Sequence, residues 1–116
     1  MIKKKIRRKS NPELIELVHF LKKQSEFWQH VAELLARPKR KTIEVNLNKI
    51  NKLTKDNSTV VIPGKVLSDG EISKPLTIAA FSFSDAARQK LRNSKLISID
   101  ELAKMNKKGE GIIIIL

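Results

Sequence analysis

Residues 58–84 read STVVIPGKVLSDGEISKPLTIAAFSFS, and two apolar runs within this stretch decide the fold. The first run, residues 59–62, is β-branched throughout and stops at Pro63-Gly64. This predicts a strand followed by a tight turn in which Gly64 supplies a positive φ. The second run, residues 76–83, is the longest strand candidate, and its Ala, Ile and Phe residues are typical of a strand covered on both faces. The centre of the chain is therefore expected to be rich in β-structure.

Two amphipathic helices are predicted on the N-terminal side of this centre. Asn11 and Pro12 suit a helix start, as the N-cap and the first helical residue. Apolar residues then recur at helical spacing as far as about Gln24. A second helix is expected from a cap at Ser25 to shortly before Pro38, because a proline disfavours helical backbone at the residue before it.

Shorter elements are predicted on both sides of the centre. A strand at residues 43–45 is expected to precede a short helix at residues 47–53. A further helix should run over residues 84–93, and the S-x-x-E spacing of residues 98–101 should start a last helix. Residues 112–116 are aliphatic without alternation, which indicates a buried strand that completes the sheet. Three apolar residues should share one face of the helix at residues 47–53: Leu47, Ile50 and Leu53.

The length and composition suit one compact domain. With 116 residues, 41% of them hydrophobic, the chain can bury a single core without disulfides or a metal. It contains no cysteine, which excludes thiolate metal sites and thiol nucleophiles. We expect an α/β mixed fold, with a single globular domain at residues 11–116 that follows a basic N-terminal arm at residues 1–10. The longest aliphatic run is five residues, whereas a spanning helix needs roughly 20, so we expect no membrane partner.

The charge of the chain predicts a polyanionic partner. Twenty-four Lys and Arg residues against 12 Asp and Glu residues give a net charge of +12, which exceeds what solubility requires. Ten of these cations form two clusters. The arm carries six of them, which is half of the net charge: Lys3, Lys4, Lys5, Arg7, Arg8 and Lys9. The second cluster surrounds Pro38 at a predicted helix end: Arg37, Lys39, Arg40 and Lys41.

Composition alone leaves RNA and DNA open, because contacts to phosphate carry little sequence information. The chain has one Trp, four Phe and no Tyr, and no strand resembles the aromatic strands on which single-stranded bases stack. Recognition of the nucleic-acid backbone or of its shape is therefore the expected mode of binding.

Catalysis is the main competing class of function, and its usual residue patterns are missing. His19 and His30 lack the spacing of a zinc site and fit ordinary packing or surface roles. Carboxylates occur at helix starts and turns rather than as an acid and base pair. Gly64-Lys65 lacks the remaining residues of a nucleotide-binding loop, so Lys65 is expected to point either to an RNA phosphate or to water. We expect no enzyme activity, no cofactor and no small-molecule substrate.

The stretch quoted above belongs to a longer pattern. It also includes Asn11-Pro12 and the basic segment at residues 37–41, which leads into Glu44-Val-Asn-Leu47. This pattern resembles the archaeal and eukaryotic family of large-subunit ribosomal protein eighteen of the e-type, which is related in fold to bacterial large-subunit protein fifteen. The resemblance covers nearly the whole chain, and the chain length is similar to that of archaeal members.

The resemblance implies a structural constituent of the large ribosomal subunit in the cytoplasm. Its expected partners are large-subunit ribosomal RNA and neighbouring large-subunit ribosomal proteins, and its expected fold consists of irregular β-β-α units. A free-standing RNA-binding chaperone or translation accessory protein is the alternative, since it would share the charge and the fold. The family expectation of RNA contact falls on six matching residues: Arg37, Lys39, Arg40, Lys41, Asn46 and Lys65.

We predict that deletion of residues 112–116 unfolds the protein, because the sheet loses a strand and the core loses aliphatic side chains. Far-ultraviolet circular dichroism and urea unfolding would measure the effect. A variant that lacks residues 1–9 is the control, and it should keep the native spectrum because the arm cannot bury itself. A cooperative urea transition of unchanged midpoint in the C-terminal deletion would contradict the prediction.

Overall fold

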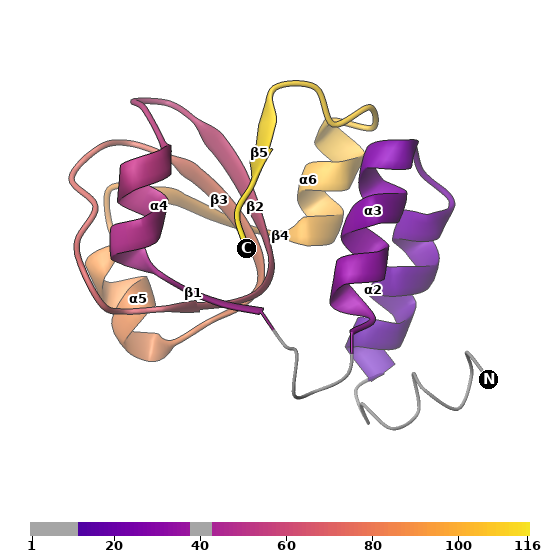
Figure 1. Cartoon of the computed structure of the whole chain (residues 1–116), viewed down its shortest axis with the longest axis horizontal. Coiled ribbons are helices and arrows are strands. Elements are labelled where there is room, and N and C mark those ends of the chain that lie inside the picture. Colours follow the sequence, from indigo (N-terminus) through magenta and orange to yellow (C-terminus); the bar gives the residue numbers. More distant parts are fainter. Residues whose placement is uncertain (1–11, 38–42) are drawn as a thin grey trace.

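The computed structural model describes residues 12–37 and 43–116, which form one α/β domain (Figure 1). The arm and residues 38–42 lie outside the described residues, together with the predicted N-cap at Asn11. The helices are α2 (Pro12–Lys22), α3 (Glu26–Leu35), α4 (Leu47–Leu53), α5 (Asp85–Lys90) and α6 (Ile99–Met105). The strands are β1 (Ile43–Asn46), β2 (Thr59–Leu67), β3 (Thr77–Phe83), β4 (Lys95–Ser98) and β5 (Ile112–Ile114). The α/β mixed fold predicted from the sequence is confirmed.

The five strands form one parallel sheet with β2 near its centre. The order is β1-β2-β3-β4, and β5 also pairs with β2. Strand β3 occupies one edge of β2, so β1 and β5 share the other edge. Strand β5 pairs with residues 59–61, and β1 pairs with residues 64–67.

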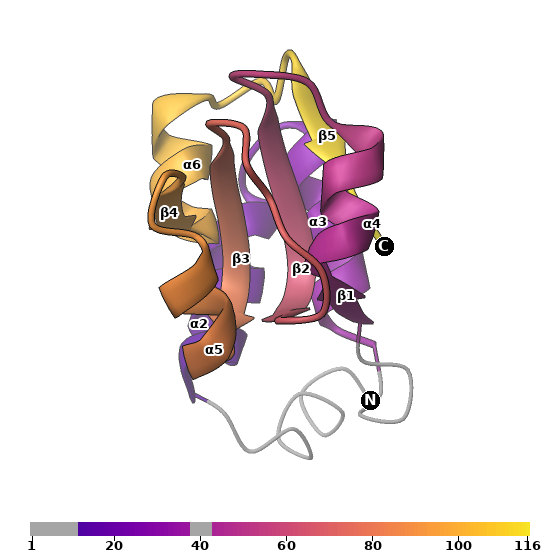
Figure 2. The same cartoon turned by 90° about the vertical axis from the view of Figure 1, so that its left-hand side faces the viewer.

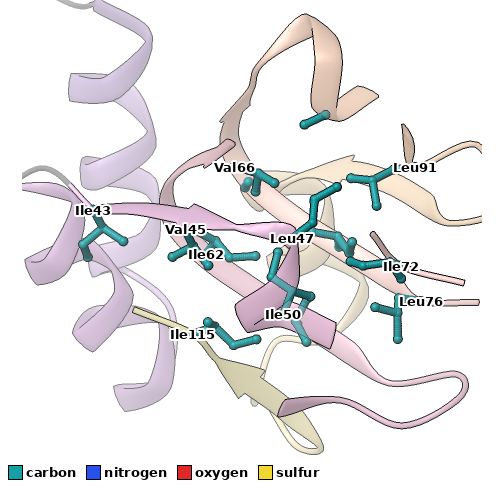
Figure 3. Close-up of a cluster of buried hydrophobic side chains, with 14 of the residues drawn as sticks. Ile43, Val45, Leu47, Ile50, Ile62, Val66, Ile72, Leu76, Leu91 and Ile115 are labelled. Atoms are coloured by element: carbon teal, nitrogen blue, oxygen red, sulfur yellow. The ribbon is translucent and has the colours of Figure 1, made fainter. Parts of the chain in front are cut away.

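Helices cover both faces of this sheet, as a parallel sheet requires (Figures 1 and 2). Helices α4 and α5 lie on one face, and α2, α3 and α6 lie on the other. Buried side chains divide accordingly into two groups, which we call the α4-side core and the α2-side core. Figure 3 shows the α4-side core. Strand β3 contributes Ile78 and Ala80 to the α4-side core and Ala79 to the α2-side core, which confirms that it is covered on both faces.

The predicted turn at Pro63-Gly64 is wrong, because β2 runs through it without interruption. The pairing of β2 with β3 shifts register between Ile62 and Lys65, which fits the missing N–H of the proline. Gly64 does not have a positive φ. Its importance is steric, since a Cβ atom at this position would lie 2.1 Å from the carbonyl oxygen of Ile43 on β1. The glycine therefore permits the close approach of β1 and β2.

Other differences have simple geometric causes. Leu53 is 53% exposed, because steps of three residues rotate each side chain by about 60° around a helix and carry the third away from the core. Residues 112–116 form a strand only as far as Ile114, and Ile113 is exposed whereas Ile115 is buried. Strand β4 was not predicted, since its apolar part is a single pair of residues, which Lys95 and Ser98 flank.

The three serines expected at helix starts differ in what their hydroxyls do. Ser84 accepts a hydrogen bond from the backbone N–H of Ala87 at 3.1 Å, as a cap should. The hydroxyl of Ser98 instead donates to the carboxylate of Glu101 at 3.1 Å and makes no hydrogen bond to the helix backbone. Ser25 is the N-cap residue of α3 by backbone conformation alone. Helix α5 is therefore the helix whose predicted cap is confirmed in full.

We predict that Gly64→Ala lowers the free energy of unfolding by about 3 kcal/mol, because its methyl group meets backbone rather than a movable side chain. Urea unfolding followed by circular dichroism would measure the change. Gly111→Ala is the matched control: its φ is 74°, but the added methyl group has open space around it. Only the backbone strain of about 1 kcal/mol is expected there. Equal losses in the two variants would show that the contact with β1 is unimportant.

Candidate nucleic-acid interface

The α2 and α3 helices bring the two attachment points of the basic clusters to the same end of the domain. The helices pack against each other as a hairpin, with Leu14, Val18 and Leu21 of α2 in the same core as Trp28 and Val31 of α3. The first residue of α2 and the last residues of α3 consequently lie side by side, far from the turn that joins the helices (Figure 1). The arm precedes Pro12 and residues 38–42 follow Arg37. Both clusters therefore meet the domain at one end.

Lys65 lies on the sheet near this end. It is exposed, and its register partners are Glu44 on β1 and Ser82 on β3. Its neighbour Val66 belongs to the α4-side core, so alternation along the strand turns Lys65 toward the face that α2 and α3 cover. The residue before it, Gly64, contacts the first residue of β1, where the segment 38–42 rejoins the described chain. We call the end of the domain that carries Pro12, Arg37 and Lys65 the basic end.

The structure describes three of the residues predicted to contact RNA. Arg37 and Lys65 are exposed, and neither forms an ion pair with another residue in the ranges 12–37 and 43–116. Their charges are therefore available to an external anion. The remaining predicted cations lie outside the described residues: Lys3, Lys4, Lys5, Arg7, Arg8, Lys9, Lys39, Arg40 and Lys41.

Asn46, the third described residue, has a role within the fold. Its side-chain oxygen accepts a hydrogen bond from the backbone N–H of Asp69 at 3.1 Å. The N–H of Asn48 donates to the carbonyl of Asp69 at 3.0 Å. The next residue, Gly70, has a φ of 98° and leaves no space for a Cβ atom beside Asn48. Asn46 thus fastens the turn after β2 to the start of α4, and its contact with RNA stays a prediction.

Several other lysines are engaged by backbone carbonyls. The ammonium of Lys74 donates to the carbonyls of Asn51 and Thr54 at 2.8 and 2.6 Å, at the C-terminal end of α4. The ammonium of Lys90 donates to the carbonyls of Ser68 and Gly70 at 2.9 and 3.2 Å. Lys49 donates to the carbonyl of Leu116. These three cations stabilise helix ends, turns or the chain end, so the net charge overstates what an external partner can use.

Three further cations lie on α5 or shortly after it, outside the two basic clusters: Arg88, Lys90 and Arg92. All three are exposed, but two of them already contact the protein. The guanidinium of Arg88 lies 5.2 Å from the centre of the Phe83 ring, and Lys90 holds the turn described above. Nothing in the sequence distinguishes these roles, because each partner lies on another element.

The described residues do not assemble a metal site. No group of three or more His, Asp or Glu side chains gathers among them. His19 and His30 are exposed on α2 and α3, as surface residues. The helices in the described ranges are also too short and too polar to cross a bilayer.

Comparison with known proteins gives one consistent family. Residues 3–116 match the family model described as ribosomal protein 60S L18 and 50S L18e. A protein named large ribosomal subunit protein eL18 from Archaeoglobus fulgidus is 46% identical over 112 residues, which cover 90% of this chain and 96% of that protein. Proteins of the same name from Methanospirillum hungatei and Methanoregula boonei are 42% and 39% identical. They are covered over 89% and 94% of their lengths, and this chain over 87% and 92%.

We predict opposite effects for the same substitution at two lysines. Lys74→Gln should lower the free energy of unfolding by about 2 kcal/mol, because two carbonyls lose a charged donor. Lys65→Gln should change stability by less than about 0.5 kcal/mol. On a heparin column the order reverses: Lys65→Gln should elute at lower salt than the native protein, and Lys74→Gln at the same salt. Equal behaviour of the two variants in either measurement would contradict this division of roles.

Proposed function

Because this chain belongs to the family of ribosomal proteins 60S L18 and 50S L18e, we propose that it binds large-subunit ribosomal RNA through the basic end, as a structural constituent of the subunit. The chain is a ribosomal protein of the large subunit and not an enzyme. Its place is accordingly the ribosome in the cytoplasm.

The observation that carries the proposal is the meeting of both basic clusters at one end of the domain. Ten cations, six in the arm and four around Pro38, join the domain beside each other. Lys65 adds an eleventh cation near this end, and neither it nor Arg37 forms an ion pair with a residue in the described ranges. A concentrated positive field of this kind releases counterions from a phosphate backbone when it binds, and this release supplies much of the affinity.

The different roles of the lysines also favour the basic end as the RNA-binding surface. The cations that hold carbonyls, Lys49, Lys74 and Lys90, lie on or near α4 and α5. The cations without described partners include those at the basic end. RNA contact at the basic end leaves the other surfaces to neighbouring large-subunit ribosomal proteins, which we propose as the remaining partners. The binding requires no cofactor.

We predict a steep salt dependence for binding to large-subunit ribosomal RNA transcribed in vitro. If about eight of the ten cluster cations neutralise phosphates, log K falls against log salt with a slope of roughly −7. Replacement of Arg37, Lys39, Arg40 and Lys41 by Gln should make this slope shallower by about three. Filter binding at several salt concentrations would measure both values.

A matched control uses two other exposed, adjacent lysines. Lys107 and Lys108 follow α6 at the far end of the domain from the basic end (Figure 1). Their replacement by Gln should leave the slope nearly unchanged. If the slope becomes shallower in both variants in proportion to the number of cations removed, the binding is diffuse and the basic end has no special role.

The alternative, a free-standing RNA-binding chaperone or translation accessory protein, makes a different prediction in cell extracts. A constituent of the subunit should sediment with large subunits through sucrose gradients at high salt, because many buried contacts hold it. An accessory protein should remain at the top of the gradient. Release of the chain from intact subunits at high salt would favour the alternative.

A further inference from the structure

The helices that follow β3 and β4 pack on opposite faces of the sheet. The helix after β3, α5, contributes Ala87 to the α4-side core, whereas the helix after β4, α6, contributes Leu102 to the α2-side core. Two adjacent parallel strands are thus followed by helices on opposite faces (Figure 2). In open parallel sheets, the crevice outside the carboxyl ends of two such strands is where ligands bind.

A cavity of about 240 Å³ occupies this crevice, and we call it the β3–β4 pocket. Its volume is smaller than the 300–1,000 Å³ that is usual for drug-sized ligands, so it suits one small planar group. The lining combines half-buried apolar side chains with polar ones. Those that decide its chemistry are Phe81, Phe83, Arg88, Leu96, Ser98 and Glu101.

Part of the pocket lining provides a surface for stacking. The guanidinium of Arg88 lies over the ring of Phe83 at 5.2 Å from its centre. Arg88 is exposed, and a planar guanidinium stacks well on a nucleobase. Phe81 and Leu96, both half-buried, add apolar wall. The pocket thus offers stacking surfaces that can replace the neighbouring bases of an unstacked nucleotide.

The pocket lining also provides hydrogen-bond acceptors. Ser98 donates its hydroxyl to Oε1 of Glu101 at 3.1 Å, and both residues line the pocket. A carboxylate has two acceptor oxygens and no donor, so it prefers an edge with two adjacent N–H donors. Among the four RNA bases, guanine presents such an edge, with its N1–H and its N2 amino group.

The pocket also borders the basic end. Lys65 on β2 is paired in register with Ser82, which lies between Phe81 and Phe83 on β3. A nucleotide whose base enters the pocket would therefore have its phosphate within the field of the cations that the basic end provides. Glu101 lies beside a basic surface but cannot contribute to phosphate binding, since a carboxylate repels phosphate.

We propose that the β3–β4 pocket binds a single unpaired guanine of large-subunit ribosomal RNA, stacked on Arg88 and hydrogen-bonded to Glu101. This inference rests on the proposed function and adds base recognition to it. It also extends the expectation from the sequence, which favoured contact with the backbone or shape of the RNA. The contact with Glu101 selects the base, whereas the basic end supplies affinity without selection.

The test uses kethoxal, which modifies N1 and N2 of unpaired guanines, on in vitro transcribed large-subunit ribosomal RNA saturated with the full chain. One guanine should be protected by the native protein. It should become reactive again with Glu101→Gln and with Arg88→Ala, although both complexes still form. Glu110→Gln is the matched control, because Glu110 is exposed in the turn after α6, and it should preserve the protection.

The change in affinity for RNA is a second readout, because base recognition and charge predict changes of opposite sign. Loss of a negative charge should strengthen binding to RNA if electrostatics alone matters, and Glu110→Gln should show at most this small gain. Glu101→Gln should instead weaken binding by about tenfold, as the loss of a paired base contact does. The slope of log K against log salt should stay unchanged in Glu101→Gln.

The outcomes separate the two proposals. If the native protein binds with the predicted salt dependence but no guanine depends on Glu101, the pocket proposal is overturned and the proposed function stands. If the native protein leaves no footprint on large-subunit RNA and shows no salt-dependent binding, both are overturned. The pocket is established as a base-binding site if one guanine becomes reactive to kethoxal with Glu101→Gln and with Arg88→Ala but stays protected with Glu110→Gln.

Discussion

The parallel pairing of β2 with three other strands constrains most of this structure. Parallel strands need crossover connections, and their sheet must be covered on both faces. The short chain meets both requirements by placing α4 and α5 on one face and α2, α3 and α6 on the other. The α2–α3 hairpin that covers one face is also what sets Pro12 beside Arg37. The covering of a buried sheet therefore determines where the basic clusters meet.

The sequence predicted the elements whose local pattern and tertiary environment agree. The β-branched residues 59–62 and the apolar residues 76–83 form strands, and Ser84 caps its helix as expected. Pro63-Gly64 misled the prediction because the same dipeptide serves a turn or a bulge, and only the neighbouring Ile43 carbonyl decides between them. Strand β4 was missed because four residues are too few for periodicity, and its pairing partner lies in another part of the sequence.

The basic character of the candidate site could be predicted from composition, but the roles of single cations could not. Lys74 and Lys65 look alike in sequence, yet one holds two carbonyls some 20 residues away and the other faces outward. The same holds for Asn46, whose partner is the backbone of Asp69. The β3–β4 pocket was also beyond prediction, because its walls come from two strands and two helices. Long-range hydrogen bonds and crossover topology are properties of the fold, and local patterns do not contain them.

The pairing of β5 with β2 also has a consequence for the folding pathway. Residues 112–114 must find residues 59–61 across about half of the chain, so we expect this contact to form later than the pairs that α4 and α5 connect. Until then, the β-branched edge of β2 lacks its partner and can recruit a strand from another molecule. While this edge is exposed, the newly made protein is at risk of aggregation. The duration of this period depends on the rate at which β5 docks. A high concentration of unassembled chains makes this risk greater, which links the position of one short strand to the rate at which the cell can safely produce the protein.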